Sequence, residues 1–356
     1  MSSESNRIYG LDVLRAFAVL TVVLGHSLSY LPSQAVAVLG WLIFDGVTAF
    51  FVLSGFLIGG IFIKTLERND RQPRVLLNFW GRRWMRTLPP YFLVLAALMV
   101  LRPAEVAWPA IAKYWVFLQN FRNPHPPFFA EAWSLSVEEW FYLLVPLAIF
   151  LLTKFTRLGI SKAVLYTALA VLTLVTGYRY YKFLHIPSPA TYDWDQQFRK
   201  IVITRLDSLV YGVVGAYLAR YLPTQWAKHK KGLLLAGLAL LLLIQVQLPL
   251  GSLFTYVFSF SLTSAATLML LPYLSQWKTG HGTFASVLTH VSLISYPLYL
   301  VHRSLVMYTL VDPLGTFVSL PPLVSFGLVW LFSWGLSALL HKYFEVPIMQ
   351  LRNRWL

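Results

Sequence analysis

Apolar runs that are long enough to cross a membrane recur along the whole chain, and short polar segments separate them. The third run begins at Pro89-Pro90, which leaves its start open, and a half-apolar stretch at 106–121 is expected to form a re-entrant or surface helix. The pattern predicts an all-α polytopic membrane protein with about ten transmembrane helices. The expected spans are 9–29, 41–62, 88–103, 134–153, 161–181, 201–221, 232–248, 252–274, 285–309 and 321–341.

The composition agrees with this pattern. The 356 residues are 57% hydrophobic and 12% charged, about half the charge fraction of ordinary soluble domains. The chain has no cysteine, which excludes disulfides, thiolate metal sites and a cysteine nucleophile, and no other cluster of ligands indicates a metal. No linker or low-complexity tract divides the sequence, so we expect one integral-membrane domain over residues 1–356.

The net charge of +15 would suggest a nucleic-acid partner in a soluble protein. Here it has a simpler explanation, because cytoplasmic loops of membrane proteins carry an excess of Lys and Arg. If the N-terminus is placed in the cytoplasm, most of the basic residues fall in the inner segments. We therefore expect both termini in the cytoplasm, membrane lipid around the chain and no nucleic acid bound to it.

The first span carries Asp12, Arg15 and His26 among apolar residues. Arg15 and His26 are separated by about three helical turns, so their side chains lie on one stripe roughly 16 Å apart, and Asp12 shares that stripe. An arginine inside a bilayer must face protein or water, so this helix face is expected to line a polar passage. The alternative is that Arg15 reaches the headgroups and His26 only hydrogen-bonds within the bundle.

The segment Lys64–Arg86 is the most basic part of the chain and ends with Arg82, Arg83 and Arg86. One interpretation is an ordinary anchor beside anionic lipid. The other is an anion site, because clustered guanidinium groups suit phosphates well. An acyl donor with a phosphorylated nucleotide head would need such a site.

Three later spans also contain polar side chains. In AWSLSVEEWFYL, Ser134 and an acid in the first turn would start a helix, but two adjacent acids cannot share a face, so one must point elsewhere. Arg205 and Asp207 lie in an apolar context and are most simply a structural device with partners elsewhere. A stripe in ISYPLYLVHRS would either pack internally or line the same passage as the first span. The residues concerned are Glu138, Glu139, Tyr296, Tyr299 and His302.

Taken together, these segments resemble the membrane-bound acyltransferase 3 family. The first span, LDVLRAFAVLTVVLGHS, is similar to the family's Arg-x10-His motif. FFVLSGFLIG, RRWMRTLPPY, AWSLSVEEWFYL, RLDSLVYG, SYPLYLVH and YFEVP match later blocks of the family in the same order. Each motif is short, but the ordered set is specific, and it covers the chain from Tyr9 to about Pro347.

The resemblance implies a ten-span enzyme of the bacterial inner (cytoplasmic) membrane. Such enzymes take an acyl group, usually acetyl, from cytoplasmic acyl-CoA and place it on a hydroxyl of an extracytoplasmic glycan or glycolipid. Some relatives carry a fused extracytoplasmic domain, which we do not expect here. The family's essential His and its paired Arg fall on His26 and Arg15, and its RxxR block, associated with the coenzyme, falls on Arg83 and Arg86. Its Ser-Leu-Ser-x-Glu-Glu block falls on Ser134, Ser136, Glu138 and Glu139.

The chain departs from the family pattern at two positions. Many members have an acid directly before FFVLSGF, where this chain has Thr48 and an acid, Asp45, three residues earlier. Many also have Gln after the Glu pair, where this chain has Trp140. Either change would alter acceptor choice without removing the histidine or the arginines.

The residues themselves agree with an acyltransferase. His26 lies roughly 25 Å along the first span, where a neutral imidazole can take a proton from a sugar hydroxyl that attacks a thioester, or can itself accept the acyl group. Glu138 is expected at a similar depth, where it would orient His26 or contact the sugar. The competing classes are a proton-coupled transporter and a non-catalytic membrane assembly protein; the absence of an obvious inverted repeat argues against the transporter.

Overall fold

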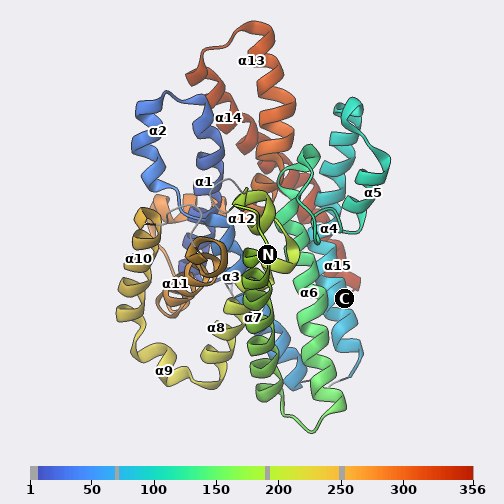
Figure 1. Cartoon of the computed structure of the whole chain (residues 1–356), viewed down its shortest axis with the longest axis vertical. Coiled ribbons are helices and arrows are strands. Elements are labelled where there is room, and N and C mark those ends of the chain that lie inside the picture. Colours follow the sequence, from blue (N-terminus) through green and yellow to red (C-terminus); the bar gives the residue numbers. More distant parts are fainter. Residues whose placement is uncertain (1–6, 69–71, 189–192, 248–252, 356) are drawn as a thin grey trace.

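The structure is a computed structural model that describes residues 7–68, 72–188, 193–247 and 253–355. Every regular element in these ranges is a helix (Figure 1). The longer helices are α1 (Tyr9–Ser27), α3 (Gly46–Arg68), α4 (Arg74–Leu101), α6 (Ala132–Phe155), α7 (Ile160–Leu184), α8 (Leu206–Tyr221), α10 (Lys230–Gln247), α11 (Ser259–Leu274), α12 (Gly282–Val301) and α14 (Pro322–Leu340). Shorter helices are α2 (Ser33–Leu39), α5 (Trp108–Trp115), α9 (Pro223–Lys228), α13 (Asp312–Val318) and α15 (Val346–Trp355).

The helices have the length and surface of a membrane protein. Within the described ranges, 8 helices are long and apolar enough to cross a membrane. The predicted spans 201–221 and 232–248 correspond to α8 and α10, which are not among these helices. Apolar side chains face outward, as at Leu174 and Leu331, which are 71% and 65% exposed. The prediction of an all-α polytopic membrane protein is confirmed.

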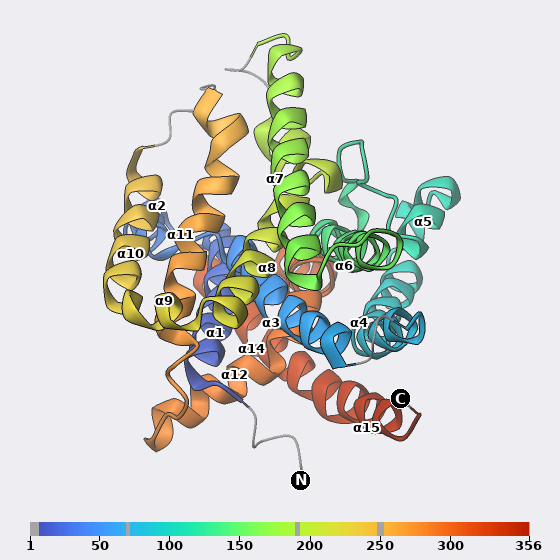
Figure 2. The same cartoon turned by 90° about the horizontal axis from the view of Figure 1, so that it is seen from below.

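Helices α1, α3 and α8 form the middle of the bundle, with α10 and α11 on one side and α4 and α6 on the other (Figure 2). α3 crosses α8 at two glycines. A Cβ atom on Gly55 would lie 1.9 Å from the carbonyl oxygen of Leu209, and one on Gly212 would lie 2.1 Å from that of Val52. Small residues allow membrane helices to approach this closely, so both positions require glycine.

Prolines interrupt fewer helices than the sequence suggested. The start of the third helix, which the sequence left open at Pro89-Pro90, lies earlier than the apolar run, because α4 begins at Arg74 and runs through both prolines. Such prolines are tolerated when neighbouring groups bond the freed backbone. In α6, Pro146 has no N–H for the carbonyl of Tyr142, and the indole Nε1 of Trp80 donates to that carbonyl instead, at 2.9 Å. The basic end of α4 is therefore part of a membrane helix.

The stretch before α3 and the stretch at 106–121 also differ from apolar spans. α3 begins at Gly46 rather than 41 because the Oδ1 atom of Asp45 accepts the backbone N–H of Thr48 at 3.0 Å, as a helix cap does. At 106–121 the structure has the 8-residue helix α5, too short to span. The prediction that this stretch does not cross the membrane as a full span is confirmed.

Both ends of the described chain lie at the same end of the bundle. Arg15, near the start of α1, and Arg86 line one cavity, and Arg86 lies 3.9 Å from Glu345, just before α15. Arg352 in α15 donates to the backbone carbonyl of Arg82. α15 and the start of α1 accordingly appear together at the lower side of Figure 2. That this end is cytoplasmic stays a prediction.

Cysteine labelling tests the orientation without background, because the chain has no cysteine of its own. Arg157 lies in the exposed turn between α6 and α7, and Ser188 lies beyond the other end of α7. We expect Arg157→Cys to react with a membrane-impermeant maleimide only from the cytoplasmic side, and Ser188→Cys only from outside. The reverse labelling would place the Lys64–Arg86 segment outside and exclude a cytoplasmic donor there.

Candidate active site

A cavity of about 240 Å³ lies between α1, α3, α4, α6 and α12. Three arginines, Arg15, Arg83 and Arg86, line one end, at the side where the two chain termini lie. Apolar side chains of α3 form much of its wall. Ser134 and Tyr299 line the other end, and their hydroxyls are 2.6 Å apart. The cavity therefore leads from a cationic mouth to a polar pair deeper in the bundle.

The cationic end is held by ion pairs at the start of α1. Asp12 is buried and binds Arg7, with 2.7 Å between Asp12 Oδ1 and Arg7 Nη2. Asp12 Oδ1 also lies 3.5 Å from Arg15 Nη1 and accepts the hydroxyl of Ser292 at 2.7 Å. Asp12 thus positions Arg15 at the cavity, which fits the polar passage predicted for this helix face.

Glu138 lies in the arginine network instead of beside His26. Its Oε2 atom is 3.0 Å from Nη2 of Arg83 and accepts the hydroxyl of Tyr142 at 3.2 Å. The Arg83 guanidinium also lies over the Tyr142 ring, 4.2 Å from its centroid. The expected contact between Glu138 and His26 is not formed, because α6 points this carboxylate toward α4. A catalytic role for Glu138 stays a prediction, but the structure gives it the position of an arginine partner.

The neighbouring residues of the same block in α6, together with Tyr296 of α12, form hydrogen bonds inside the bundle. Glu139 accepts the hydroxyl of Thr87 at 2.9 Å, and the hydroxyl of Tyr296 donates to the carbonyl of Thr87 at 2.6 Å, near the prolines of α4. Ser136 donates to the carbonyl of Ala132 at 3.1 Å. Of these residues, Thr87 and Tyr296 also line the cavity.

His26 meets a second histidine, His302, at the end of α12. The distance from His26 Nδ1 to His302 Nε2 is 2.8 Å, and His302 Nδ1 lies 2.7 Å from the carbonyl oxygen of Tyr299. A carbonyl only accepts, so His302 Nδ1 carries a hydrogen and His302 Nε2 has a lone pair when this ring is neutral. His26 Nδ1 must then donate. This hydrogen-bond chain assigns the free lone pair of His26 to Nε2.

Two residues near this pair were missed by the sequence analysis: Arg303 and Glu131. Nη1 of Arg303 lies 3.2 Å from Nε2 of His26. Glu131 is buried, and its carboxylate accepts the backbone N–H groups of Arg303 and Ser304, each at 2.8 Å. Burial raises the pKa of Glu131, although the hydrogen bonds from Ser304 act against this. Arg303 directly follows the motif SYPLYLVH, and this position could have marked it as a site residue. Glu131 lies in a loop, where no pattern in the sequence pointed to it.

Glu131 holds a π-helical segment, η9 (His302–Val311), that continues α12. A π-helix is rare, and short π segments occur often at functional sites because they change the direction of side chains. Here the segment begins at His302, directly before Arg303. The carboxylate of Glu131 satisfies N–H groups at its first turn and so positions both side chains against α1.

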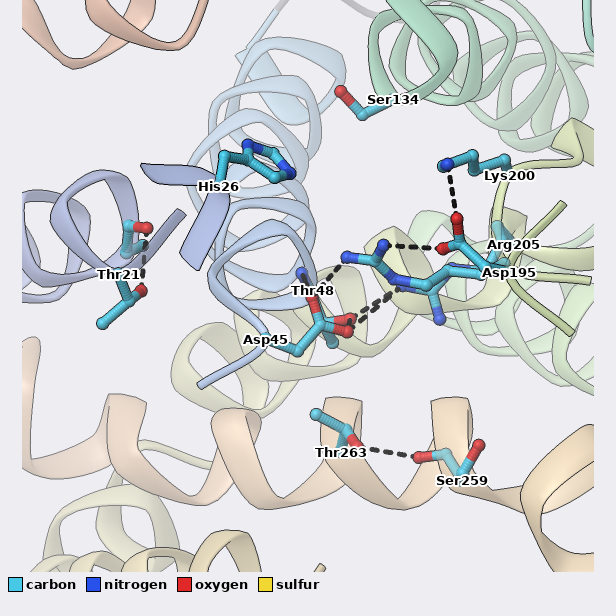
Figure 3. Close-up of polar contacts among 12 residues, drawn as sticks. Thr21, His26, Asp45, Thr48, Ser134, Asp195, Lys200, Arg205, Ser259 and Thr263 are labelled. Carbon is cyan, nitrogen blue, oxygen red and sulfur yellow. Dashed lines mark hydrogen bonds and ion pairs between the residues drawn. The ribbon is translucent and has the colours of Figure 1, made fainter. Parts of the chain in front are cut away.

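Arg205 and Asp207 have partners in other helices, as the structural interpretation predicted. Both are fully buried. Nη2 of Arg205 donates to the hydroxyl of Thr48 at 2.7 Å and lies 3.9 Å from Asp45 (Figure 3), while Asp207 is 2.7 Å from Arg179. Asp45, the acid three residues before Thr48, thus belongs to the same buried network as Arg205.

The segment before α8 adds charges beside Asp45. Asp195 binds Arg199 at 3.0 Å and also pairs with Lys200, and Arg199 lies 3.6 Å from Asp45. Burial acts to raise the pKa of Asp195, but these cations hold it below its ordinary value. In Figure 3, His26 and Ser134 lie on the side of Asp45 and Thr48 opposite the helix that carries Ser259 and Thr263.

Comparison with known proteins decides the family. The acyltransferase 3 model, described as an acyltransferase domain, matches residues 8–342, which is nearly the whole chain. The chain belongs to the acyltransferase 3 family. Among curated proteins it is similar to the O-acetyltransferase OatA of Staphylococcus aureus, with 33% identity over 185 residues, and to the peptidoglycan O-acetyltransferase OatA of Listeria monocytogenes, with 29% identity over 167 residues.

These two matches cover 47% and 41% of this chain and 29% and 25% of the relatives. The matched part of the chain thus covers less than a third of the length of these two curated relatives. No solved structure matches it. Within the described residues no group of three or more potential ligands is placed to hold a metal ion.

Proposed function

We propose that this acyltransferase 3 protein is a bacterial inner-membrane O-acetyltransferase. It takes an acetyl group from cytoplasmic acetyl-CoA and transfers it to a hydroxyl of an extracytoplasmic glycan. The names of the relatives support the acetyl group and, for the Listeria protein, a peptidoglycan acceptor. The observation that supports the proposal is a cavity lined by an arginine cluster and by Tyr299. His26 does not line this cavity, but it is linked to Tyr299 through His302.

The arginine end suits the phosphate groups of the donor. Arg83 and Arg86 lie one turn apart on α4 and both line the cavity, while Arg82 is exposed beside them. Arg15 adds a further guanidinium from α1. Guanidinium groups bind phosphates with charge-assisted, often bidentate hydrogen bonds, so the nucleotide head would bind at this mouth and the acyl arm would extend along α3.

The chemistry would take place at His26. Tyr299 lines the inner end of the cavity, and its carbonyl bonds His302, the partner of His26. The acceptor hydroxyl gives its proton to His26 Nε2 while its oxygen attacks the thioester carbonyl carbon. When the tetrahedral intermediate collapses, the C–S bond breaks and the thiolate takes the proton from His26, which releases the thiol. The same Nε2 atom would be the nucleophile if the acyl group passed through an acyl-histidine.

Donor binding tests the proposal. In proteoliposomes supplied with labelled acetyl-CoA on the cytoplasmic face, we expect Arg86→Gln and Arg83→Gln to raise the KM for acetyl-CoA about tenfold or more, since a hydrogen bond to a charged group contributes roughly 1.5–3 kcal/mol. Turnover at saturating donor should change much less. Arg86→Gln is the cleaner variant, because its partner Glu345 keeps a 2.9 Å bond to His341, whereas Arg83→Gln leaves Glu138 without its cation.

Arg74→Gln is the matched control, because Arg74 is an exposed arginine at the start of the same helix. Soluble N-acetylglucosamine oligomers inside the vesicles serve as acceptor, and ester-linked label is counted. Unchanged donor KM in both variants would contradict the donor site. Transfer only when donor and acceptor share one face would contradict transfer across the membrane.

A further inference from the structure

Arg303 differs from the other internal cations near the end of the bundle where His26 lies. Arg179, Arg199, Lys200 and Arg205 each have a carboxylate within 4.0 Å. No carboxylate in the described parts of the chain lies that close to the guanidinium of Arg303. Glu131 is the acid nearby, but its carboxylate accepts the backbone N–H of Arg303 and contacts Ser304, and it lies 4.0 Å from Nδ1 of His302.

The guanidinium is held in place without being neutralised. Its Nε atom donates to the hydroxyl of Tyr308 at 2.7 Å, and Nη1 lies 3.2 Å from His26 Nε2. The side chain is half-buried. A half-buried arginine that lacks an acid in the protein is costly in a membrane. This cost indicates that a ligand, instead of a carboxylate of the protein, pairs with the guanidinium of Arg303.

The surrounding charge has the same sign. His125, in the loop before α6, is buried, and this burial together with the positive charges of Lys200 and Arg303 lowers its pKa to about 3. Arg303 and Lys200 thus both add positive potential at the loop that precedes Glu131, and of these two cations Lys200 is paired with Asp195. An anion is the ligand that such a region attracts.

We propose that Arg303 binds a carboxylate of the acceptor, so that the preferred acceptor is an acidic glycan. The inference rests on the proposed acetyl transfer and specifies its substrate class. It also explains the contact with His26. As long as Nη1 donates to Nε2, the lone pair that must accept the hydroxyl proton is occupied. A carboxylate forms a stronger, charge-assisted and often bidentate bond with the guanidinium, draws it away from His26 and frees Nε2. A neutral sugar competes for the guanidinium only through weaker hydrogen bonds.

The test uses two probes that differ at the carboxyl group, which is charged in one and a neutral ester in the other: short oligogalacturonates and their methyl esters. We expect the wild-type protein in nanodiscs to bind the free acid at least tenfold more tightly than the ester, and acetyl transfer to favour the acid by a similar factor, mainly through KM. Arg303→Gln should remove this preference by weakening the binding of the acid to about the level of the ester. Arg303→Lys should keep part of it, because lysine preserves the charge but not the fork geometry.

Arg122→Gln is the matched control, since Arg122 is an exposed arginine in the loop that contains His125; it should keep the preference for the acid. Equal affinity of the wild type for acid and ester, or binding of neither at millimolar concentration, would overturn the proposal. So would an Arg303→Gln variant that keeps the preference, or one that loses turnover on both probes equally. If Arg303→Gln does not fold, the Arg303→Lys variant and the wild-type comparison decide.

Failure of this inference is distinct from failure of the proposed function. A wild-type protein that transfers acetyl groups to neutral and acidic acceptors alike keeps the proposed function and loses the acidic acceptor. A protein that binds oligogalacturonate but never transfers acetyl from acetyl-CoA loses the proposed function and keeps an anion site.

Discussion

Acetyl transfer should fall at least 10³-fold when His26 is replaced by alanine, with normal insertion and abundance of the protein. General-base catalysis alone contributes roughly 10²–10⁴-fold, and no other described imidazole lies within hydrogen-bond distance of this position except His302, whose Nε2 lone pair is directed at His26. The loss should appear in turnover, while the KM for acetyl-CoA stays near the wild-type value, because the arginine end of the cavity is separate from this ring.

The measurement is label transferred to the glycan at saturating donor, with His229→Ala as control. His229 is an exposed histidine between α9 and α10 and should behave as the wild type. Transfer at wild-type rates in a correctly inserted His26→Ala protein would remove His26 from the chemistry and reopen the transporter alternative.

The second large effect is expected at His302. Replacing it with alanine removes the acceptor for His26 Nδ1–H, so the ring is free to take the other tautomer or to turn. Loss of the group that fixes the tautomer of a catalytic histidine costs roughly 10³–10⁴-fold in turnover. We expect a fall of this order in kcat, with little change in the KM for either substrate.

His302→Gln separates positioning from packing. The glutamine oxygen can accept from His26 Nδ1 while its amide nitrogen donates to the carbonyl of Tyr299. The His302→Gln variant should therefore be at least tenfold more active than His302→Ala. Full activity in the alanine variant would show that His26 needs no partner. Equal loss in both variants, with lowered melting temperatures, would indicate that His302 only fills space.

The sequence was sufficient for features that depend on local composition. The membrane helices follow from hydrophobic length, and the stripe of Asp12 and Arg15 follows from helical period; both agree with the structure. Arg83 and Arg86 could be placed at one site because they lie one turn apart on one helix. That this basic segment is continuous with the span could not be predicted, since two prolines normally end a helix, whereas α4 runs through both Pro89 and Pro90.

Features that depend on pairing between distant segments could not be predicted. His26 and His302 are 276 residues apart in the sequence, and the sequence of neither helix indicates that it packs against the other. The sequence placed Glu138 near His26 because the two were expected at a similar depth in the membrane, but its position around the axis of α6 directs it to Arg83. The π segment after Val301 is invisible to a periodicity argument, because it needs the carboxylate of Glu131 from another part of the chain.

The role of Glu131 limits how this protein can evolve toward new acceptors. In the loop from Val116 to Ala130 no residue is assigned to the chemistry. Its exposed positions 122–124 can therefore diverge and, under the proposed function, change which sugar is admitted, whereas Asn120 and Phe129 are fully buried. Position 131 cannot diverge with it, because the same carboxylate that ends the loop also supports the histidine on another helix. Exchange of this loop between relatives should therefore transfer acceptor preference when the graft stops at Ala130, and should inactivate the enzyme when it replaces Glu131 with a residue that cannot accept two hydrogen bonds.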